Sequence, residues 1–255
     1  MKENKELELE NDNVLKEINN KEFNIFYQPQ YEVLGDRLCV RSSEAMIRGD
    51  ILQIGEQKEK TNEVGKWLIQ KVVREQKEWI DTGINVKRVY VPINIEGLED
   101  KTFSRYIKEE VNKVGLKAKY LGVSLTGVDG VKEVKKVNKG IRKVQKLGVT
   151  VAVEDESCEG LGGVEELEYD VLKIAESCVE DIHKGDNLKR VAETVKVAKK
   201  KGKEVIVSGV ESEEIQDILS RLGCDIFQGI LFSKEIESEK YKSMLREGIG
   251  TCFLR

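Results

Sequence analysis

Short strand-like runs alternate with helix-like stripes along most of this chain. The runs lie at residues 23–28, 38–47, 88–95, 120–125, 149–154, 171–174, 204–207 and 225–228. Between them, apolar residues recur at the three- and four-residue spacing of a helix that buries one face. Three of these stripes end at Gly115, Gly148 and Gly223, as expected where a glycine closes a helix. About eight strand–helix units in 255 residues predict an α/β fold of the TIM-like (β/α)8 barrel class.

The first two strands are predicted to depart from this pattern. They meet across Leu34, Gly35, Asp36 and Arg37, a hairpin turn signal, so we expect the barrel to open with an antiparallel strand. An open doubly wound sheet is the alternative, but the glycine-rich phosphate loop typical of that fold is missing. No Ser-, Gly- or Pro-rich linker divides the sequence. We therefore expect one domain over residues 1–255, with a helix in residues 1–20 and a tail at 248–255.

Composition argues against several functions. The formal net charge is -4 and both signs are interspersed, so no basic stripe suggests binding to a nucleic acid polymer. No stretch approaches the ~20 apolar residues that span a membrane, and the first residues lack the apolar core of a signal peptide. The five cysteines are scattered and odd in number, which favours a reducing compartment over a disulfide framework or a zinc site. These features predict a cytoplasmic protein.

Any chemistry must come from carboxylates, amides and lysine, because a single histidine, His183, excludes triads and multi-histidine metal sites. In such a barrel the site lies at the carboxyl ends of the strands. Those ends carry Gln28, Glu44, Arg48, Asn94, Ser124, Thr126, Glu154, Asp155, Lys173, Ser208, Glu211 and Gln228. Lys173 alternates with apolar neighbours, so its ammonium should point into the barrel, where only carboxylates could offset its burial. Glu44, Glu154 and Asp155 are the available partners, and a structural ion pair and a catalytic role both remain open.

Six motifs at these strand ends follow the order of a known family. Residues 27–29 match its opening Tyr-Gln-Pro, and Glu44-Ala45-Met46-Ile47-Arg48 resembles its Glu-Ala-Leu-Leu-Arg signature. Residues 91–95, 171–174, 209–211 and 228–233 resemble its Val-Asn-Leu/Ile, Leu-Lys-Ile-Asp, Ala-Glu-Gly-Val-Glu and Gln-Gly-Tyr-Leu-Phe segments. The matches span residues 14 to about 241. The chain therefore resembles the EAL domains.

The resemblance implies a function in bacterial cyclic di-GMP signalling. The family hydrolyses cyclic di-GMP to linear pGpG with two Mg²⁺ or Mn²⁺ ions, hard cations that suit oxygen ligands. By position, the metal ligands correspond to Glu44, Asn94, Glu154 and Asp155, with Glu154 in place of an Asp. The catalytic positions correspond to Lys173 and Glu211, and the positions near the dinucleotide to Gln28, Arg48 and Gln228.

The same comparison indicates a degenerate site. Ser124, Ala175 and Ser208 stand where the family has carboxylates, and the loop after Asp155 lacks the Phe-Gly-Thr-Gly motif. These losses predict a large fall in the affinity for two divalent cations. The sequence thus favours an inactive domain without a cofactor, acting as a cyclic di-GMP receptor or as a scaffold for a signalling protein. The alternative is an active cyclic di-GMP phosphodiesterase, which would need Mg²⁺ or Mn²⁺.

Overall fold

The structure is a computed structural model that describes residues 23–48, 58–100, 102–128, 131–156, 164–180, 182–248 and 253–254. Its strands are β1 (Asn24–Leu34), β2 (Arg37–Arg48), β3 (Arg88–Asn94), β4 (Leu121–Thr126), β5 (Thr150–Asp155), β6 (Val171–Ile174), β7 (Glu204–Val207), β8 (Ile226–Phe227), β9 (Ile236–Glu237) and β10 (Phe253–Leu254). Its helices are α3 (Lys58–Asp81), α4 (Phe103–Val114), α5 (Val134–Gln145), α6 (Glu176–Glu180), α7 (Asn187–Lys200), α8 (Glu213–Arg221) and α9 (Ser238–Arg246). Short 3-10 helices are η1 (Ile95–Glu99), η2 (Ala118–Tyr120) and η4 (Val164–Glu166). The helix expected in residues 1–20 lies outside the described residues.

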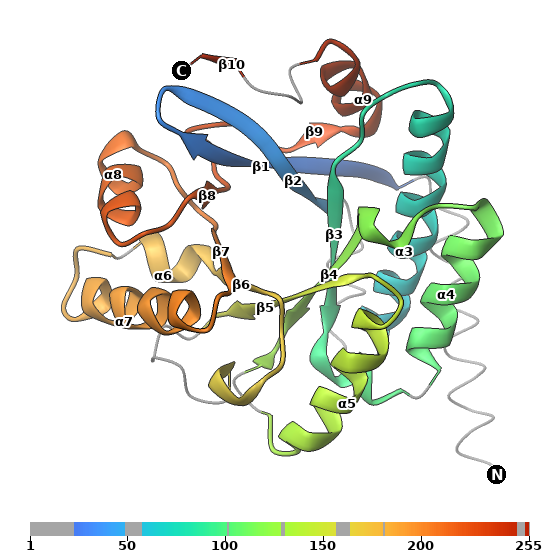
Figure 1. The fold of residues 1–255 in the computed structure, drawn as a ribbon, viewed down its shortest axis with the longest axis horizontal. Helices are drawn as coiled ribbons and strands as arrows, with labels where there is room; N and C mark the ends of the chain where they lie inside the picture. The colour runs from blue at the N-terminus through green and yellow to red at the C-terminus, as the bar shows by residue number, and fades with distance from the viewer. Residues whose placement is uncertain are drawn as a thin grey trace.

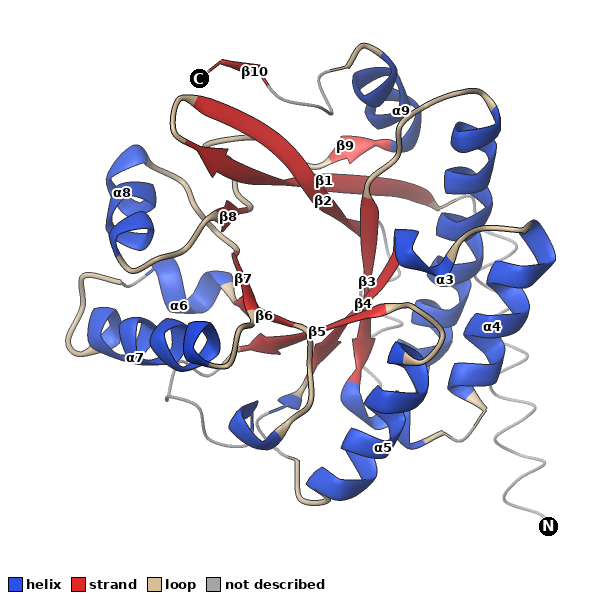
Figure 2. Ribbon diagram, viewed as in Figure 1, coloured by secondary structure: helices blue, strands red, loops and turns tan. Residues whose placement is uncertain are grey.

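Strands β1 to β8 close into a barrel with helices around the outside (Figure 1). Neighbouring strands from β2 to β8 are parallel, and β1 closes the barrel by pairing antiparallel with both β2 and β8. Figure 2 shows the strands as an inner ring and the helices as an outer layer. The predicted TIM-like barrel with an antiparallel first strand is therefore confirmed.

The opening hairpin is longer than the sequence pattern predicted. β1 pairs with β2 from Asn24 opposite Arg48 to Leu34 opposite Arg37, with a register shift after Gln30. Gly35 turns the chain at a φ of 63°, which favours glycine. The first strand was expected to end before Pro29, but it continues because proline lies between the residues that pair with β9 and those that pair with β8. Because Pro29 has no β8 or β9 residue opposite it, its missing backbone N–H removes no hydrogen bond between strands on that edge of β1.

The barrel interior is arranged in layers. One layer is apolar and is made of Tyr90, Ala152, Val171, Ile206 and Ile226. The Tyr90 ring fits there because the facing residue on β4 is Gly122, whose added Cβ would lie 2.5 Å from the ring. Alternate residues of a strand face the same side, so the next inward positions on β5, β6, β7 and β8 are polar. They are Glu154, Lys173, Ser208 and Gln228, and they place the site directly above the apolar layer.

The main core lies between the barrel and its helices. The predicted stripe on α3 is part of it, since Trp67, Leu68 and Val72 are buried there. On the same side, Tyr27 of β1 stacks on Tyr241 of α9 at a centroid distance of 4.9 Å. These contacts attach α3 and α9 to the antiparallel hairpin, whose strands carry Gln28 and Glu44 of the site.

The prediction that the cysteines form no disulfides is wrong. Cys39 of β2 and Cys178 of α6 each take part in a disulfide, whereas Cys224 is free and buried. Pairing depends on which cysteines the fold brings together, and spacing along the chain does not reveal it. The cysteines therefore no longer support a reducing compartment. Among the described helices, none combines the length and the apolar character needed to cross a membrane.

Candidate functional site

A cavity of about 310 Å³ opens at the carboxyl ends of the barrel strands. Seven residues predicted from the sequence line it: Gln28, Glu44, Glu154, Lys173, Ser208, Glu211 and Gln228. They come from β1, β2, β5 and β6, from the segment between β7 and α8, and from the residue that follows β8. The barrel topology thus brings together groups that are up to 200 positions apart in the sequence, as between Gln28 and Gln228.

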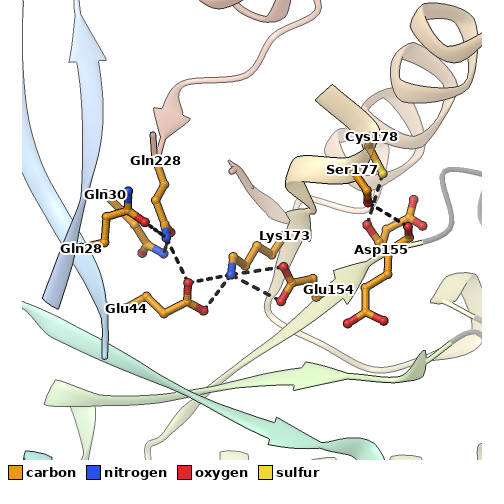
Figure 3. A network of polar contacts seen from close by, with 10 residues as sticks. Gln28, Gln30, Glu44, Glu154, Asp155, Lys173, Ser177, Cys178 and Gln228 are labelled. Atoms are coloured by element: carbon orange, nitrogen blue, oxygen red, sulfur yellow. Dashed lines mark hydrogen bonds and ion pairs between the residues drawn. The ribbon is translucent and has the colours of Figure 1, made fainter. Parts of the chain in front are cut away.

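Lys173 lies at the centre of the cavity floor and is only 5% exposed. Its Nζ donates to both oxygens of Glu44, at 2.7 and 2.8 Å. Both carboxylate oxygens of Glu154 lie 3.3 Å away. Figure 3 shows the ammonium between the two glutamates, one from β2 and one from β5. The buried ammonium is therefore neutralised by two carboxylates, as such burial requires.

The titration of this cluster is governed by its burial. Burial alone would lower the pKa of Lys173, but the charges of Glu44 and Glu154 outweigh it and raise that pKa. For Glu154, burial raises the pKa, Lys173 opposes this, and the nearby charge of Glu44 raises it further. Lys173 is therefore charged throughout the neutral range, and Glu154 is the carboxyl that takes up a proton more readily than an exposed glutamate.

A chain of side-chain amides continues from Glu44 toward β1. Gln228 donates through Nε2 to Glu44 at 3.0 Å and to the side-chain oxygen of Gln28 at 2.8 Å. Gln28 in turn donates to the carbonyl of Ser233 at 3.2 Å. The oxygen of the Gln228 amide accepts from Gln30 at 2.7 Å. Gln28 and Gln228 are thus held by one another before any ligand enters.

Arg48 lies at the rim rather than in the cavity lining. Its guanidinium Nη2 contacts Glu235 at 2.6 Å and its Cζ lies 5.4 Å from the centre of the Phe26 ring. The side chain is 62% exposed, and Glu235 is one of the residues that line the cavity. Arg48 is therefore an exposed cation that a carboxylate of the rim already engages.

Two residues at metal-ligand positions of the family face elsewhere. The side-chain oxygen of Asn94 caps η1, where it accepts from the backbone N–H of Glu96 at 3.0 Å. Asp155 is 3% exposed, and Figure 3 shows it beside Ser177 and Cys178 of α6, apart from the Lys173 ammonium. Its charge adds to burial and to Glu165 in raising the pKa of the core tyrosine Tyr169 to about 12. Asn94 and Asp155 are therefore not part of the described cavity lining.

The three positions of lost carboxylates are buried. Among the residues that the structure describes, the hydroxyls of Ser124 and Ser208 have no hydrogen-bond partner, and Ser208 lines the cavity. Ala175 is 7% exposed and packs in the main core. Two small unpaired hydroxyls and a methyl group thus occupy positions where carboxylates would be needed to hold cations.

A pair of divalent cations does not fit this set of residues. Such a pair needs several carboxylate or amide oxygens converging within a few ångströms. Both oxygens of Glu44 contact Lys173, the oxygen of Asn94 is used in a cap, and Asp155 points away. Over the part of the chain that the structure describes, no group of three or more His, Cys, Asp or Glu residues has a metal-binding arrangement. The Lys173 ammonium supplies the positive charge at this place.

Sequence reasoning missed several residues of the site. Met46, Glu176, Ile230 and Glu235 also line the cavity, and Gln30 is fully buried beneath it. Strand alternation could have identified Gln30, since it lies two residues beyond Gln28 on the same strand. Glu176, Ile230 and Glu235 lie in segments after strand ends, where alternation does not apply.

The chain is similar to known proteins in sequence and in structure. The profile of the family described as EAL domain matches residues 11–235. Signaling protein YkoW of Bacillus subtilis is 26% identical over 96% of this chain and 32% of its own length. Cyclic di-GMP phosphodiesterase PdeR of Escherichia coli is 28% identical over 90% of this chain and 36% of its own length. The chain thus spans about a third of these curated relatives.

Solved structures show the same fold. The EAL domain of Mycobacterium smegmatis DcpA superposes with a TM-score of 0.76 at 22% identity, covering 89% of this chain and 98% of its own. The phosphodiesterase PaMucR, solved as a c-di-GMP complex, superposes with a TM-score of 0.78 at 19% identity, covering 90% of this chain and 99% of its own.

Proposed function

This chain belongs to the EAL domain family of cyclic di-GMP signalling, and we propose that it binds the nucleotide without hydrolysing it. One observation carries the proposal: the Lys173 ammonium contacts both Glu44 and Glu154, the two cavity carboxylates that a catalytic cation pair would need. With those oxygens engaged and Asn94 and Asp155 directed elsewhere, no cation pair is available to activate water or to hold the phosphodiester oxygens.

The nucleotide ligand is supported by solved relatives and by the retained amides. The EAL domain of Xanthomonas citri FimX, at a TM-score of 0.75, was solved in complex with c-diGMP, as PaMucR was. In this chain, Gln28 and Gln228 keep the family positions near the dinucleotide, and both line the cavity. Their amides supply donors and acceptors of the kind that recognise nucleobase edges and phosphate oxygens.

The charge of the cavity decides how such a ligand would bind. Its lining holds one lysine against five glutamates, which are Glu44, Glu154, Glu176, Glu211 and Glu235. A cyclic dinucleotide carries two phosphate charges, so the acidic rim opposes its entry. Arg48 is the cation best placed to offset this, because it is exposed and its contact with Glu235 lies at the rim. We therefore expect Arg48 to leave Glu235 and contact a phosphate of the nucleotide when the nucleotide binds.

Calorimetric titration with cyclic di-GMP, with and without Mg²⁺, tests the proposal, and chromatography of the same mixtures tests for linear product. R48A should weaken binding by about tenfold, because a charge-assisted phosphate contact is lost. E235Q should strengthen it by about threefold or more, because it frees Arg48 and removes a negative charge. Linear product formed at ordinary enzyme rates with Mn²⁺ would show an active phosphodiesterase and refute the proposal.

A protein scaffold is the second candidate, and one feature of the rim favours it. Ile230 is 53% exposed at the cavity mouth, an unusual position for a large apolar side chain. Across the described residues, no cation contacts the neighbouring Glu176 or Glu211. Apolar surface beside unpaired carboxylates suits a basic segment of another protein. If titration with cyclic di-GMP produces no heat of binding, either with Mg²⁺ or without it, this candidate is favoured.

A further inference from the structure

Gln30 is a buried amide on β1, one inward position deeper than Gln28, and it does not line the cavity. Its Nε2 donates to the side-chain oxygen of Gln228 at 2.7 Å. Its own side-chain oxygen accepts from the hydroxyl of Ser42 on β2 at 2.5 Å. Gln30 of β1 therefore connects β2 with the residue that directly follows β8, at the level just below the site.

The direction of every bond in this chain is set by Glu44. An ionised carboxylate only accepts, so the Gln228 group that faces Glu44 must be the NH₂. The Gln228 oxygen then faces Gln30, which must present its own NH₂. The Gln30 oxygen is thereby directed at Ser42, which must donate. Because Glu44 is itself held by Lys173, one proton arrangement satisfies the whole chain from Ser42 to Lys173.

The amide chain crosses a part of the barrel where neighbouring strands share few paired backbone positions. β8 and β1 share only two paired positions, Tyr31 with Phe227 and Glu32 with Ile226. The register of β1 against β2 also shifts directly after Gln30. Between these backbone pairs and the site, β1 and the end of β8 are connected by hydrogen bonds among the side chains of Gln28, Gln30 and Gln228. The amide chain thus connects the two strands at the height where the ligand would bind.

We propose that Gln30 is a positioning residue that holds the side-chain amide of Gln228 in the orientation in which its Nε2 donates to Gln28 and Glu44. The proposal rests on three observations: Gln30 is buried, it donates to Gln228, and Gln228 donates to both Gln28 and Glu44. Gln30 acts by holding the residues that line the cavity and does not itself contact the ligand. Its effect on nucleotide affinity rests on the proposed function, whereas its effect on Gln228 does not.

The test compares Q30E with Q76E. Glutamate keeps the size of Gln30 and the acceptor for Ser42 but removes the donor to Gln228. Gln76 of α3 is the matched control, since it is equally buried and donates through Nε2 to the carbonyls of Lys87 and Tyr120 outside the cavity lining. Both variants lose a buried donor, so both should be less stable. Only Q30E should disturb the site.

The first readout is the side-chain amide signal of Gln228 in nitrogen-15 NMR spectra, assigned by its loss in Q228E. In Q30E this signal should shift and its hydrogens should exchange faster with water, while Q76E leaves it unchanged. S42A is a milder variant that removes the donor to Gln30, and it should shift the Gln228 signal by a smaller amount. It replaces Q30E in the test if Q30E does not fold. An unchanged Gln228 signal in these variants, or an equal change in Q76E, would overturn the proposal.

The second readout is cyclic di-GMP affinity. Q30E should weaken binding by about tenfold or more relative to the wild type, because Gln228 loses its orientation, and Q76E should leave affinity unchanged. Equal affinity for Q30E and the wild type would overturn the role of Gln30 in binding. If the wild type binds no nucleotide, the proposed function fails, and the NMR readout alone decides whether Gln30 positions Gln228.

Discussion

Replacing Lys173 by methionine should destabilise the barrel strongly at neutral pH and much less in acid. Methionine retains the apolar stem of the side chain but removes the ammonium that contacts Glu44 at 2.7 Å and Glu154 at 3.3 Å. Glu44 is 8% exposed and Glu154 13% exposed at the side chain, so both carboxylates would be left buried without a counter-charge. Removal of one partner from a buried ion pair costs about 3–5 kcal/mol.

The pH dependence is set by the pKa of Glu154. Burial and Glu44 already raise this pKa, and Lys173 opposes them, so K173M should raise it further. A carboxyl whose pKa is higher in the folded state contributes stability that is present below its unfolded pKa and lost as pH rises through its folded pKa. The penalty of K173M should therefore be largest at neutral pH and shrink on acidification. Each further unit of pKa corresponds to about 1.4 kcal/mol.

Urea unfolding of wild type and K173M at about pH 7.5 and about pH 5 measures this difference. The double variant K173M/E44Q is the control, because it removes one of the two unpaired charges and should recover at least about 1 kcal/mol at neutral pH. A cost of less than about 1 kcal/mol, or one that is the same at both pH values, would refute the reasoning, because it would mean that the carboxylates are not held by the ammonium.

Two further predictions concern residues outside the ion cluster. G229A should lower the free energy of unfolding in urea by about 3 kcal/mol or more, because the added Cβ would lie 2.1 Å from the backbone oxygen of Val210. In the control G202A the added Cβ has nothing within 4 Å, so its positive φ alone should cost about 1 kcal/mol. Equal costs for the two variants would contradict the steric argument. Burial raises the pKa of the Cys224 thiol to about 12, so iodoacetamide at mildly alkaline pH should modify its peptide slowly in the folded protein and quickly in urea, as monitored by mass spectrometry. Rapid modification of the folded protein would show that the thiol is accessible.

The local sequence pattern was sufficient to predict two short strands, each preceded by a charged residue. The predicted runs at 171–174 and 204–207 coincide with β6 (Val171–Ile174) and β7 (Glu204–Val207). The first strand was placed too short, because Pro29 reads as a strand end unless its neighbours are known. Pairing partners belong to the tertiary structure, and β1 extends to Leu34 because β2, β8 and β9 pair with different parts of it.

The candidate site also contains residues whose positions the local sequence pattern predicted and residues whose positions depend on the tertiary structure. Alternation along β6 predicted that Lys173 points inward, and the parallel register placed Glu154 beside it. The direction of a side chain at a strand end depends on the conformation of the next segment, and sequence did not predict it for Asn94, which caps η1, or for Asp155, which faces α6. Glu235 was missed because it reaches the cavity from a segment beyond the last barrel strand.

The apolar layer beneath the site, with the Tyr90 ring facing Gly122, has a consequence for exchange with solvent. Among the described residues, this layer lies below Lys173 and the cavity opens above it, so water, protons and any ligand reach the ammonium through the strand-end mouth. A molecule seated on that mouth would leave the Lys173 cluster sealed on both sides. Hydrogen exchange at the surrounding amides would then slow even if the molecule never touched them.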